Sequence, residues 1–335
     1  MRAAHRLALA ALFLVPAPAA AQVATAADPG LDRLTNEIER LAELSGGEMG
    51  VAALHLETGR SVTLNGAEPF PMASAYKVPI AVQLFTLVDR GEVRLDSMIA
   101  LAPGDIHPGS GVISQLLDDP GVILSLRNLV ELMLLISDNS ATDLVLRAAR
   151  GSDAVTQRMR ELGVTGVRVD RPTVGLIADF VGVRGVPPDH DIPMDRYREL
   201  ARAVSAEARD SAAAAFDRDP RDTSTPVGML ELLEKVWRGD ALSPASRDLL
   251  IDIMTRSTTG TERIRGMLPP DVSVAHKTGT IGGTTNDVGF ITLPDGAGHI
   301  AIVTYVKAST RPVEQRERAI AQVSRAIYDY FLFNP

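Results

Sequence analysis

The sequence predicts an α+β fold, an α/β sandwich joined to a helical domain. Three observations support it: strand-like segments lie near both ends of the chain, an amphipathic helix lies outside each set of strands, and the middle has a mostly helical pattern. We expect one five-stranded antiparallel sheet built from both chain ends and flanked by the terminal helices. The sheet and its helices should comprise residues 28–73 and 269–335, and the inserted, mostly helical part residues 74–268.

The N-terminal contribution to this sheet begins with a helix. Residues 31–44 carry apolar side chains at the i, i+3, i+4 spacing that is typical of an amphipathic helix. Residues 49–56 and 61–64 then flank a short segment that contains Gly59, which predicts two strands joined by a tight turn.

The C-terminal contribution consists of three strands and a final helix. Residues 272–280, 287–293 and 299–306 have the composition of strands, with a Pro-Asp-Gly turn between the last two. Residues 313–331 again show helical spacing of apolar side chains. Because the strands of one sheet come from both ends of the chain, the middle must form an insertion.

The first 21 residues have the three parts of a secretory signal in order. Two arginines precede an apolar run over residues 7–15, and small residues ending at Ala21 follow. The alternative is an ordinary N-terminal helix, but two prolines would interrupt it and the run is too short to span a bilayer. We expect cleavage near Ala21, which would leave residues 22–335 in the periplasm or outside the cell.

Composition excludes several classes of partner. The formal net charge is −8, and removal of the signal takes away two more positive charges, so nucleic acid and anionic membranes are poor partners. The chain has no cysteine, which excludes a disulfide and a lipidated cysteine. After the signal no segment is apolar enough to serve as a membrane anchor. The histidines are scattered without ligand spacing, so no metal or other cofactor is expected. The acidic surface and the lack of a long heptad pattern favour a monomer.

Lysine is rare in this chain, with four lysines against thirty arginines, and one lysine lies in Ser74-Ala-Tyr-Lys77. An apolar helical stripe follows, so the i, i+3 spacing should put the Lys77 amine beside the Ser74 hydroxyl. A lysine amine can lose its proton and activate a serine, whereas an arginine stays charged. Pro79 fits such a helix only in or near the first turn. Taken alone, the motif predicts no more than a capped surface helix.

A second polar motif, Ser137-Asp138-Asn139, lies between two helical segments. We expect the second helix to open with a capping box formed by Ser140 and Asp143. On its own the tripeptide is an ordinary turn. In an active site, Ser137 would relay a proton, and the Asn139 amide would hydrogen-bond an amide of the substrate.

The third motif, Lys277-Thr278-Gly279-Thr280, lies on a predicted strand. A strand edge can bind an extended acyl-amide substrate through backbone hydrogen bonds. Lys277 would hold a substrate carboxylate, and Gly279 would let the ligand approach the backbone closely. The alternative is a lysine that keeps a sheet edge soluble. Three arginines are close enough in sequence to be further carboxylate ligands, and the sequence does not select among them: Arg256, Arg263 and Arg265.

With these three motifs in this order, the chain resembles the class A serine β-lactamases and the related penicillin-binding proteins. The resemblance extends over nearly the whole mature chain. It includes further short segments: Phe70-Pro71-Met72, Pro108-Gly109-Ser110-Gly111, Arg221-Asp222-Thr223, Thr225-Pro226 and Asn286-Asp287-Val288-Gly289.

The resemblance implies a role for each motif residue. Ser74 would attack the lactam carbonyl, Lys77 would help to remove its proton, and Ser137 would pass a proton to the departing ring nitrogen. The backbone N–H groups of Ser74 and Thr280 would form the oxyanion hole. Asn139 would orient the substrate amide. The substrate carboxylate would be bound by Lys277, Thr278 and Thr280, beside Gly279.

The chain departs from the family at one important position. Class A enzymes carry a glutamate just after an Asp-Arg pair, and this glutamate activates the water that deacylates the serine. Here Asp170-Arg171 is followed by Pro172-Thr173, and no glutamate occurs between Glu161 and Glu199. The omega-type loop over residues 171–222, which an Arg171–Asp222 pair should close, is much longer than usual. We expect it to contain a helix over residues 194–216.

Deacylation could then depend on Lys77 itself or on a carboxylate of the long loop. The loop offers Asp179, Asp189, Asp191 and Asp195, although an ordinary solvated position is the default for each. Glu199 and Glu207 suit the exposed face of the predicted helix.

Three functions remain open. The first is a secreted β-lactamase with slow or unusual deacylation, the second a transpeptidase-like or carboxypeptidase-like acyltransferase acting on peptidoglycan stem peptides, and the third a non-hydrolysing covalent β-lactam binder. The surrounding motifs favour the first.

Overall fold

The computed structural model describes residues 28–187 and 190–334 of the chain. The predicted signal over residues 1–21 and the loop residue Asp189 lie outside the described residues. Within the described part, no helix is both long and apolar enough to cross a membrane.

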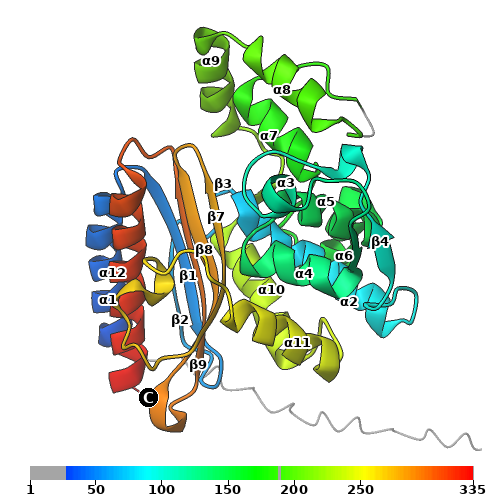
Figure 1. The fold of residues 1–335 in the computed structure, drawn as a ribbon. Helices are drawn as coiled ribbons and strands as arrows, with labels where there is room; N and C mark the ends of the chain where they lie inside the picture. Colours follow the sequence, from blue (N-terminus) through cyan, green and yellow to red (C-terminus); the bar gives the residue numbers. More distant parts are fainter. Residues whose placement is uncertain (1–27, 188–189, 335) are drawn as a thin grey trace, which may run out of the picture.

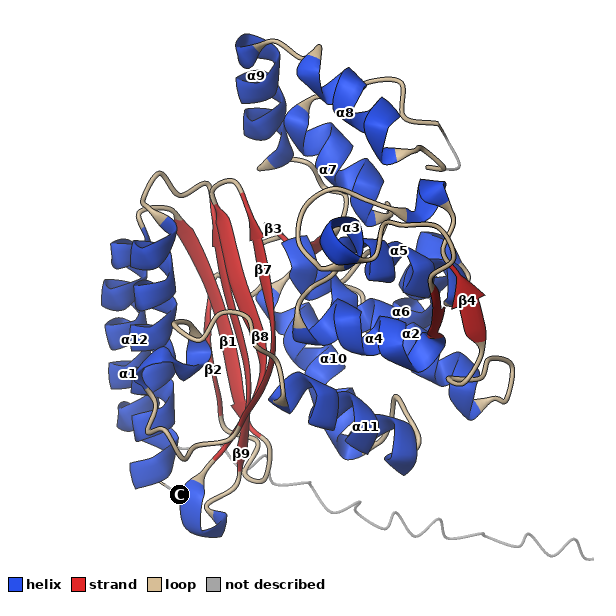
Figure 2. Cartoon of the chain, viewed as in Figure 1, coloured by secondary structure: helices blue, strands red, loops and turns tan. Residues whose placement is uncertain are grey.

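The centre of the fold is a five-stranded antiparallel sheet with the strand order β2-β1-β9-β8-β7 (Figure 2). Strand β1 from the N-terminal end pairs with β9 from the C-terminal end, which confirms that both ends of the chain build one sheet. Strand β7 forms one edge, as the third motif requires. The strands are β1 (Glu48–His55), β2 (Ser61–Leu64), β7 (Val274–Ile281), β8 (Thr284–Thr292) and β9 (His299–Lys307). Strand β8 begins three residues before the predicted start at 287, so Asn286 lies within the sheet.

One face of the sheet is covered by the terminal helices α1 (Pro29–Ala42) and α12 (Val313–Phe333), which lie side by side in Figure 1. Their apolar stripes pack against the alternate side chains of the strands, so that Ile38, Ile302 and Ile320 are fully buried in one cluster. Both predicted terminal helices are confirmed.

The opposite face carries the helical part of the chain (Figure 1). Helix α2 (Lys77–Asp89) is buried along almost its whole length, because it is apolar on nearly every side. Four helices contact it: α4 (Leu126–Leu135), α5 (Asn139–Ala148), α6 (Gly151–Glu161) and α11 (Pro244–Thr255). Helix α10 (Pro226–Arg238) packs against β1 and β9. The remaining short elements are α3 (Ile113–Leu116), β3 (Phe70–Pro71) paired with β6 (Thr223–Ser224), and β4 (Met98–Ala100) paired with β5 (Ile123–Ser125).

The long loop over residues 171–222 forms three helices that stand together at one end of the helical part (Figure 1). They are α7 (Thr173–Val181), α8 (Met194–Arg202) and α9 (Ala206–Phe216). The prediction of one helix over 194–216 was wrong, because the Ser205 side chain accepts a hydrogen bond from the Ala208 N–H and caps a new helix. Helix α7 was not predicted. Helices α7 and α8 and the segment between them share a small apolar cluster: Val174, Ala178, Val183, Ile192 and Tyr197.

Candidate active site

Ser74 lies in a single 3₁₀ turn, Ala73–Tyr76, that leads directly into α2. Ala73 has a φ of 44°, a left-handed conformation that non-glycine residues adopt rarely and that is often found at functional turns. Pro79 is the third residue of α2, so it lies in the first turn, where its missing N–H breaks no helical hydrogen bond.

Strands β7 and β8 hold the Ser74 turn from one side. A Cβ at Gly279 would lie 2.5 Å from the Met72 carbonyl oxygen and 3.0 Å from the Ser74 nitrogen, so only glycine allows β7 to approach this closely. The Asn286 side-chain amide of β8 donates hydrogen bonds to the carbonyls of Pro71 and Met72 at 2.8 and 2.9 Å. Residue 279 must therefore be glycine because the Ser74 turn packs against it, whereas the sequence had suggested that a ligand approaches the backbone there.

Lys77 is buried, and its amine points toward the second motif. Its Nζ donates to the carbonyl of Ser137 at 2.7 Å, to the Ser137 Oγ at 3.0 Å and to the Asn139 Oδ1 at 3.0 Å. Among the hydrogen bonds of the described residues, none joins Lys77 to Ser74, and the hydrogen bonds of the Lys77 amine go to the second motif. Burial lowers the pKa of Lys77 to about 7, although Asp138 and Asp143 act in the opposite direction.

Lys277 approaches the same hydroxyl from β7. Its Nζ donates to the Ser137 Oγ at 3.1 Å and to the carbonyl of Thr278 at 2.8 Å. Burial, and then the neighbouring charge of Lys77, hold the pKa of Lys277 well below its usual range. The Ser137 hydroxyl thus lies between two buried amines, which is the geometry of a proton relay.

Asp138 organises the second motif. Its side chain caps α5 by accepting from the Ala141 N–H at 2.9 Å, and its second oxygen accepts from the N–H of Val112 at 2.7 Å. The predicted capping box was wrong: the Ser140 hydroxyl instead accepts from the His107 N–H, and Asp143 faces the long loop. Ser137 itself has a φ of 61°, which turns its side chain toward the lysines.

Of the three arginines near the third motif, the structure brings Arg263 to β7. Its guanidinium donates to the Thr280 Oγ1 at 2.6 Å and to the carbonyl of Gly279 at 3.1 Å, and only 5% of the residue is exposed. Arg256 forms ion pairs with acidic side chains at the surface, and Arg265 donates to backbone carbonyls at Thr255 and Val274.

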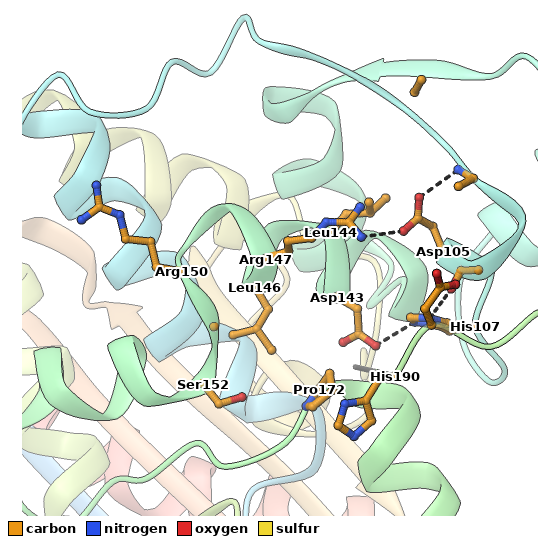
Figure 3. A pocket seen from close by; sticks show the side chains of 15 residues that line it. Asp105, His107, Asp143, Leu144, Leu146, Arg147, Arg150, Ser152, Pro172 and His190 are labelled. Carbon is orange, nitrogen blue, oxygen red and sulfur yellow. Dashed lines mark hydrogen bonds and ion pairs between the residues drawn. The ribbon is translucent and has the colours of Figure 1, made fainter. Parts of the chain in front are cut away.

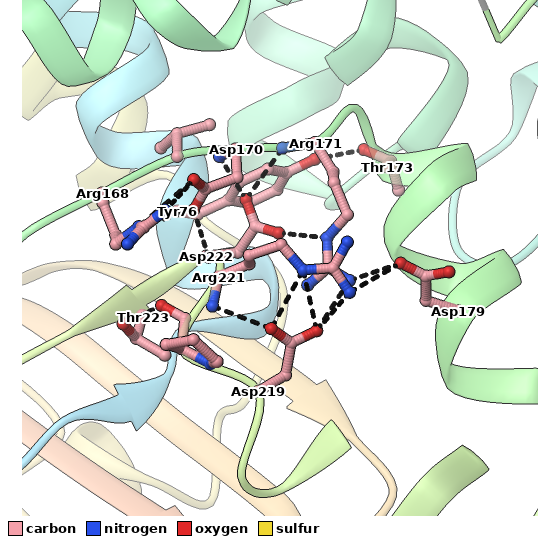
Figure 4. A network of polar contacts seen from close by, with 12 residues as sticks. Tyr76, Arg168, Asp170, Arg171, Thr173, Asp179, Asp219, Arg221, Asp222 and Thr223 are labelled. Carbon is pink, nitrogen blue, oxygen red and sulfur yellow. Dashed lines mark hydrogen bonds and ion pairs between the residues drawn. The ribbon is translucent and has the colours of Figure 1, made fainter. Parts of the chain in front are cut away.

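The long loop is closed at its base by the expected ion pair. The Arg171 Nε donates to Asp222 at 2.6 Å, while its Nη1 reaches Asp179 at 2.6 Å and Asp219 at 3.0 Å (Figure 4). Asp179, one of the candidate deacylation groups, is therefore part of the network that fixes the loop, and it does not line the cavity beside Ser74.

Thr173, where the resemblance leads us to expect a glutamate, is fixed from both sides. Its hydroxyl shares a hydrogen bond with the Tyr76 hydroxyl, and its N–H donates to Asp143 at 2.6 Å. The second Asp143 oxygen lies 2.7 Å from the His107 Nδ1 (Figure 3). Burial acts to raise the pKa of Asp143, but His107 and the N–H donors of α7 outweigh it and lower that pKa. Asp143 is thus a buried anion that fixes the start of α7 by accepting hydrogen bonds from its first N–H groups.

A cavity of about 310 Å³ lies over the nucleophile, between β7 and α7. Its polar wall includes Ser74, Asn139 and Thr280, and its α7 wall is apolar, formed by Leu176, Ile177, Phe180 and Val181. No carboxylate of the described residues lines this cavity.

The other candidate carboxylates lie elsewhere in the structure. Asp191 lines a separate cavity behind Pro172, where His190 also lies (Figure 3). Asp195 has a side chain that is 97% exposed and is paired with Arg198, and Glu199 is paired with Arg196. Glu207 is exposed at the start of α9.

Sequence reasoning missed the roles of three polar residues that build this site. Ser110 donates to the Ser137 carbonyl at 2.8 Å, and Tyr76 and Asn286 hold Thr173 and the Ser74 turn respectively. Arg263 was one of three candidate arginines, and the sequence did not predict that it would hold Thr280. Asn286 and Ser110 lie in segments that resemble the family, but no spacing rule connects them to their partners, which are distant in sequence. Only the fold brings these groups together.

Comparison with known proteins agrees with this geometry. The model of the beta-lactamase enzyme family matches residues 33–331. Beta-lactamase VEB-1 of Pseudomonas aeruginosa is 26% identical over 90% of this chain and 91% of its own, and the carbapenem-hydrolyzing beta-lactamase KPC of Klebsiella oxytoca is 28% identical over 87% and 88%.

Solved structures show the same relationship. An ancestral class A beta-lactamase superimposes with a TM-score of 0.71 at 33% identity, covering 88% of this chain and 99% of the other. A beta-lactamase from Chitinophaga pinensis gives a TM-score of 0.71 at 31% identity, with 89% and 98% covered. The fold, the order of the three motifs and these similarities together show that the chain belongs to the beta-lactamase enzyme family, with class A members as its neighbours.

Proposed function

We propose that this protein hydrolyses β-lactams through an acyl-enzyme on Ser74. The observation that carries this proposal is the Ser137 hydroxyl, which two buried lysine amines contact at 3.0 and 3.1 Å next to the nucleophile turn. This arrangement can take up the proton of the Ser74 hydroxyl and deliver a proton to the lactam nitrogen, as opening of a lactam requires.

In acylation, Lys77 in its neutral form takes the proton of the Ser74 hydroxyl, whose oxygen then bonds to the lactam carbonyl carbon. The N–H groups of Ser74 and Thr280 stabilise the oxyanion, an effect worth about 3 kcal/mol for each donor in comparable sites. When the C–N bond breaks, Ser137 gives its proton to the ring nitrogen and recovers one from Lys77. A pKa of about 7 suits Lys77 to both directions of transfer at neutral pH.

Substrate orientation depends on the other motif residues. The Asn139 side chain, whose Nδ2 donates to the Pro108 carbonyl at 2.9 Å, lies at the cavity wall and would contact the substrate amide. The ring carboxylate would be bound by Lys277, Thr278 and Thr280. Arg263 supports Thr280 from behind and adds positive charge there.

We assign deacylation to Lys77, because no carboxylate of the described residues lines the cavity and Lys77 has a pKa of about 7. Water would transfer its proton to the neutral amine as its oxygen attacks the ester carbonyl, and Ser74 would leave with a proton returned from Lys77. The α7 wall of the cavity is apolar and offers no carboxylate to activate water. This wall favours a second function, a covalent β-lactam binder whose acyl-enzyme persists. The third alternative, acyl transfer to a peptidoglycan amine, uses the same acyl-enzyme but a different acceptor.

We propose that the protein acts as a monomer in the periplasm or outside the cell after removal of residues 1–21, and that residues 22–335 form one catalytic domain. The sequence pattern of residues 1–21 and the similarity to beta-lactamases over nearly the whole chain support this proposal.

The test is intact-mass spectrometry of the mature protein after mixing with stoichiometric benzylpenicillin, followed from seconds to hours. We expect an adduct on Ser74 that forms and then disappears as hydrolysed penicillin accumulates. A stable adduct would establish the covalent binder, and faster loss of the adduct when a D-alanyl amine is added would indicate acyl transfer. Absence of any adduct would contradict all three functions.

A further inference from the structure

A second cavity, of about 440 Å³, lies beside the nucleophile cavity, between α8 and the segment over residues 108–115. Gly109 lines both cavities. A Cβ at Gly109 would lie 2.5 Å from the Asn139 Nδ2 and 3.3 Å from the Ile177 Cδ1, so this glycine lies directly against the residue that would orient the substrate amide. The two cavities therefore meet at Gly109, beside the Asn139 amide.

The lining of the second cavity is strongly basic. Arg198, Arg202 and Arg209 contribute to it, and none of its lining residues is acidic. The only ion pair that the described residues give Arg198 is one to Asp195 at 3.3 Å, and they give Arg202 none. Arg209 is anchored by its hydrogen bonds to the carbonyls of Ala201 and Val204. Three guanidinium groups with no carboxylate in the lining make the potential in this cavity positive, which favours an anion there.

Tyr197 provides a second, independent observation. The residue lines the same cavity and is only 4% exposed, and its hydroxyl has no hydrogen-bond partner in the described part of the chain. A buried hydroxyl without a partner is rare in folded proteins, because its desolvation is not compensated. Burial raises the pKa of Tyr197 to about 12, so the hydroxyl stays protonated and can donate to an anion at any working pH.

We infer that this cavity is a subsite for a carboxylate on the acyl side chain of the substrate, held by the Tyr197 hydroxyl and by Arg198 and Arg202. This inference rests on the proposed function, which places the substrate amide at Asn139. The subsite is separate from the one for the ring carboxylate, because Lys277 and Thr278 lie on β7 and the arginines lie on α8. The enzyme would thus prefer β-lactams with a second, terminal carboxylate.

The test uses 7-aminocephalosporanic acid acylated with succinyl, glutaryl or adipyl chains, each compared with its terminal methyl ester. The rate of adduct formation on Ser74 is measured by mass spectrometry, because this rate does not depend on deacylation. We expect the carboxylate to react about tenfold faster than its ester at one chain length, since a hydrogen bond to a charged group and two exposed ion pairs act together. The preference should fall at 0.5 M salt, where exposed charges are screened.

Two variants and one matched control locate the effect. Tyr197→Phe and Arg202→Ala should each reduce the preference for the carboxylate by about threefold and leave the rates of the methyl esters unchanged. Arg196→Ala removes one positive charge from the same helix, but Arg196 is paired with Glu199 and does not line the cavity, so it should have no effect. Tyr197→Phe should also leave the melting temperature unchanged or higher, because the hydroxyl has no partner to lose.

Equal rates for carboxylates and esters at every chain length would overturn the subsite while leaving the proposed function intact. A loss of preference in Arg196→Ala as large as in Arg202→Ala would also overturn it, since general surface charge would then be the cause. If no compound forms an adduct, the proposed function fails, and calorimetry with adipate then decides the subsite. Binding of adipate to the wild type that weakens in Arg202→Ala but not in Arg196→Ala would support it, and equal binding in all three proteins would refute it.

Discussion

Replacing Thr173 with glutamate would put a carboxylate at the start of α7, on the wall of the nucleophile cavity. The backbone there is already fixed, because the Thr173 N–H donates to Asp143 and this contact does not involve the side chain. Thr173→Glu therefore tests whether the missing base limits the rate of deacylation.

The expected gain follows from the local charges. The N-terminus of α7 stabilises an anion by about 0.3–1 kcal/mol. Burial at residue 173, which is 5% exposed, and the negative charge of Asp143 act in the opposite direction, so the pKa of the new carboxyl should lie above its ordinary value and the gain should grow with pH. The variant loses the hydrogen bond between Thr173 and Tyr76, at a cost of about 1 kcal/mol. A positioned general base accelerates a proton transfer by about 10²–10⁴-fold over none. Because Lys77 already serves as a base in the proposed mechanism, we expect a smaller gain in the rate of deacylation, of about tenfold.

Thr173→Gln is the matched control, because it has the same size but cannot accept the proton. The assay forms the penicillin adduct in a single turnover and follows its disappearance by intact mass, with circular dichroism to verify the fold of each variant. Equal deacylation rates for folded Thr173→Glu and Thr173→Gln proteins would refute the reasoning. In that case α7 would not present residue 173 to the acyl-enzyme.

The remaining predictions concern the nucleophile, its base and its support. Ser74→Ala should abolish covalent labelling by penicillin with no change in the unfolding transition, and an adduct elsewhere on that variant would contradict the assignment. Acylation requires neutral Lys77, whose pKa is lowered to about 7, so the acylation rate should rise with pH through about 7 and level off above it; a flat profile between pH 5 and 9 would argue against Lys77. Gly279→Ala should reduce labelling at least about tenfold, because its Cβ would lie 2.5 Å from the Met72 carbonyl oxygen and displace the Ser74 turn; an unchanged labelling rate would show that the turn tolerates the methyl group.

Local patterns predicted much of the fold. Residues 61–64 and 313–331 were placed nearly as they occur, because a strand or an amphipathic helix shows its period in its own side chains. The long loop was harder to predict. The sequences of α8 and α9 form one continuous helical pattern, and only the N-cap at Ser205 separates the two helices.

The residues of the candidate site were likewise predicted from local patterns, whereas their contacts were not. The sequence pointed to Ser74, Lys77, Ser137 and Lys277 because rare lysines lie at short, recognisable spacings. It did not predict that Lys77 would donate to Ser137, 60 residues away, and have no hydrogen bond to Ser74. Contacts of this kind depend on how α2, α5 and β7 pack, and no local period encodes that packing.

A bound substrate should affect the pKa values of the two buried lysines differently. Both amines contact the Ser137 Oγ. Burial lowers the pKa of Lys77 to about 7, whereas burial and then the positive charge of Lys77 hold the pKa of Lys277 well below its usual range. A ring carboxylate bound by Lys277 would favour the protonated form of Lys277. The negative carboxylate and the positive ammonium would then nearly cancel in their effect on the pKa of Lys77. Lys77 would therefore keep a pKa of about 7 with the substrate bound, so that it can still take the proton of Ser74.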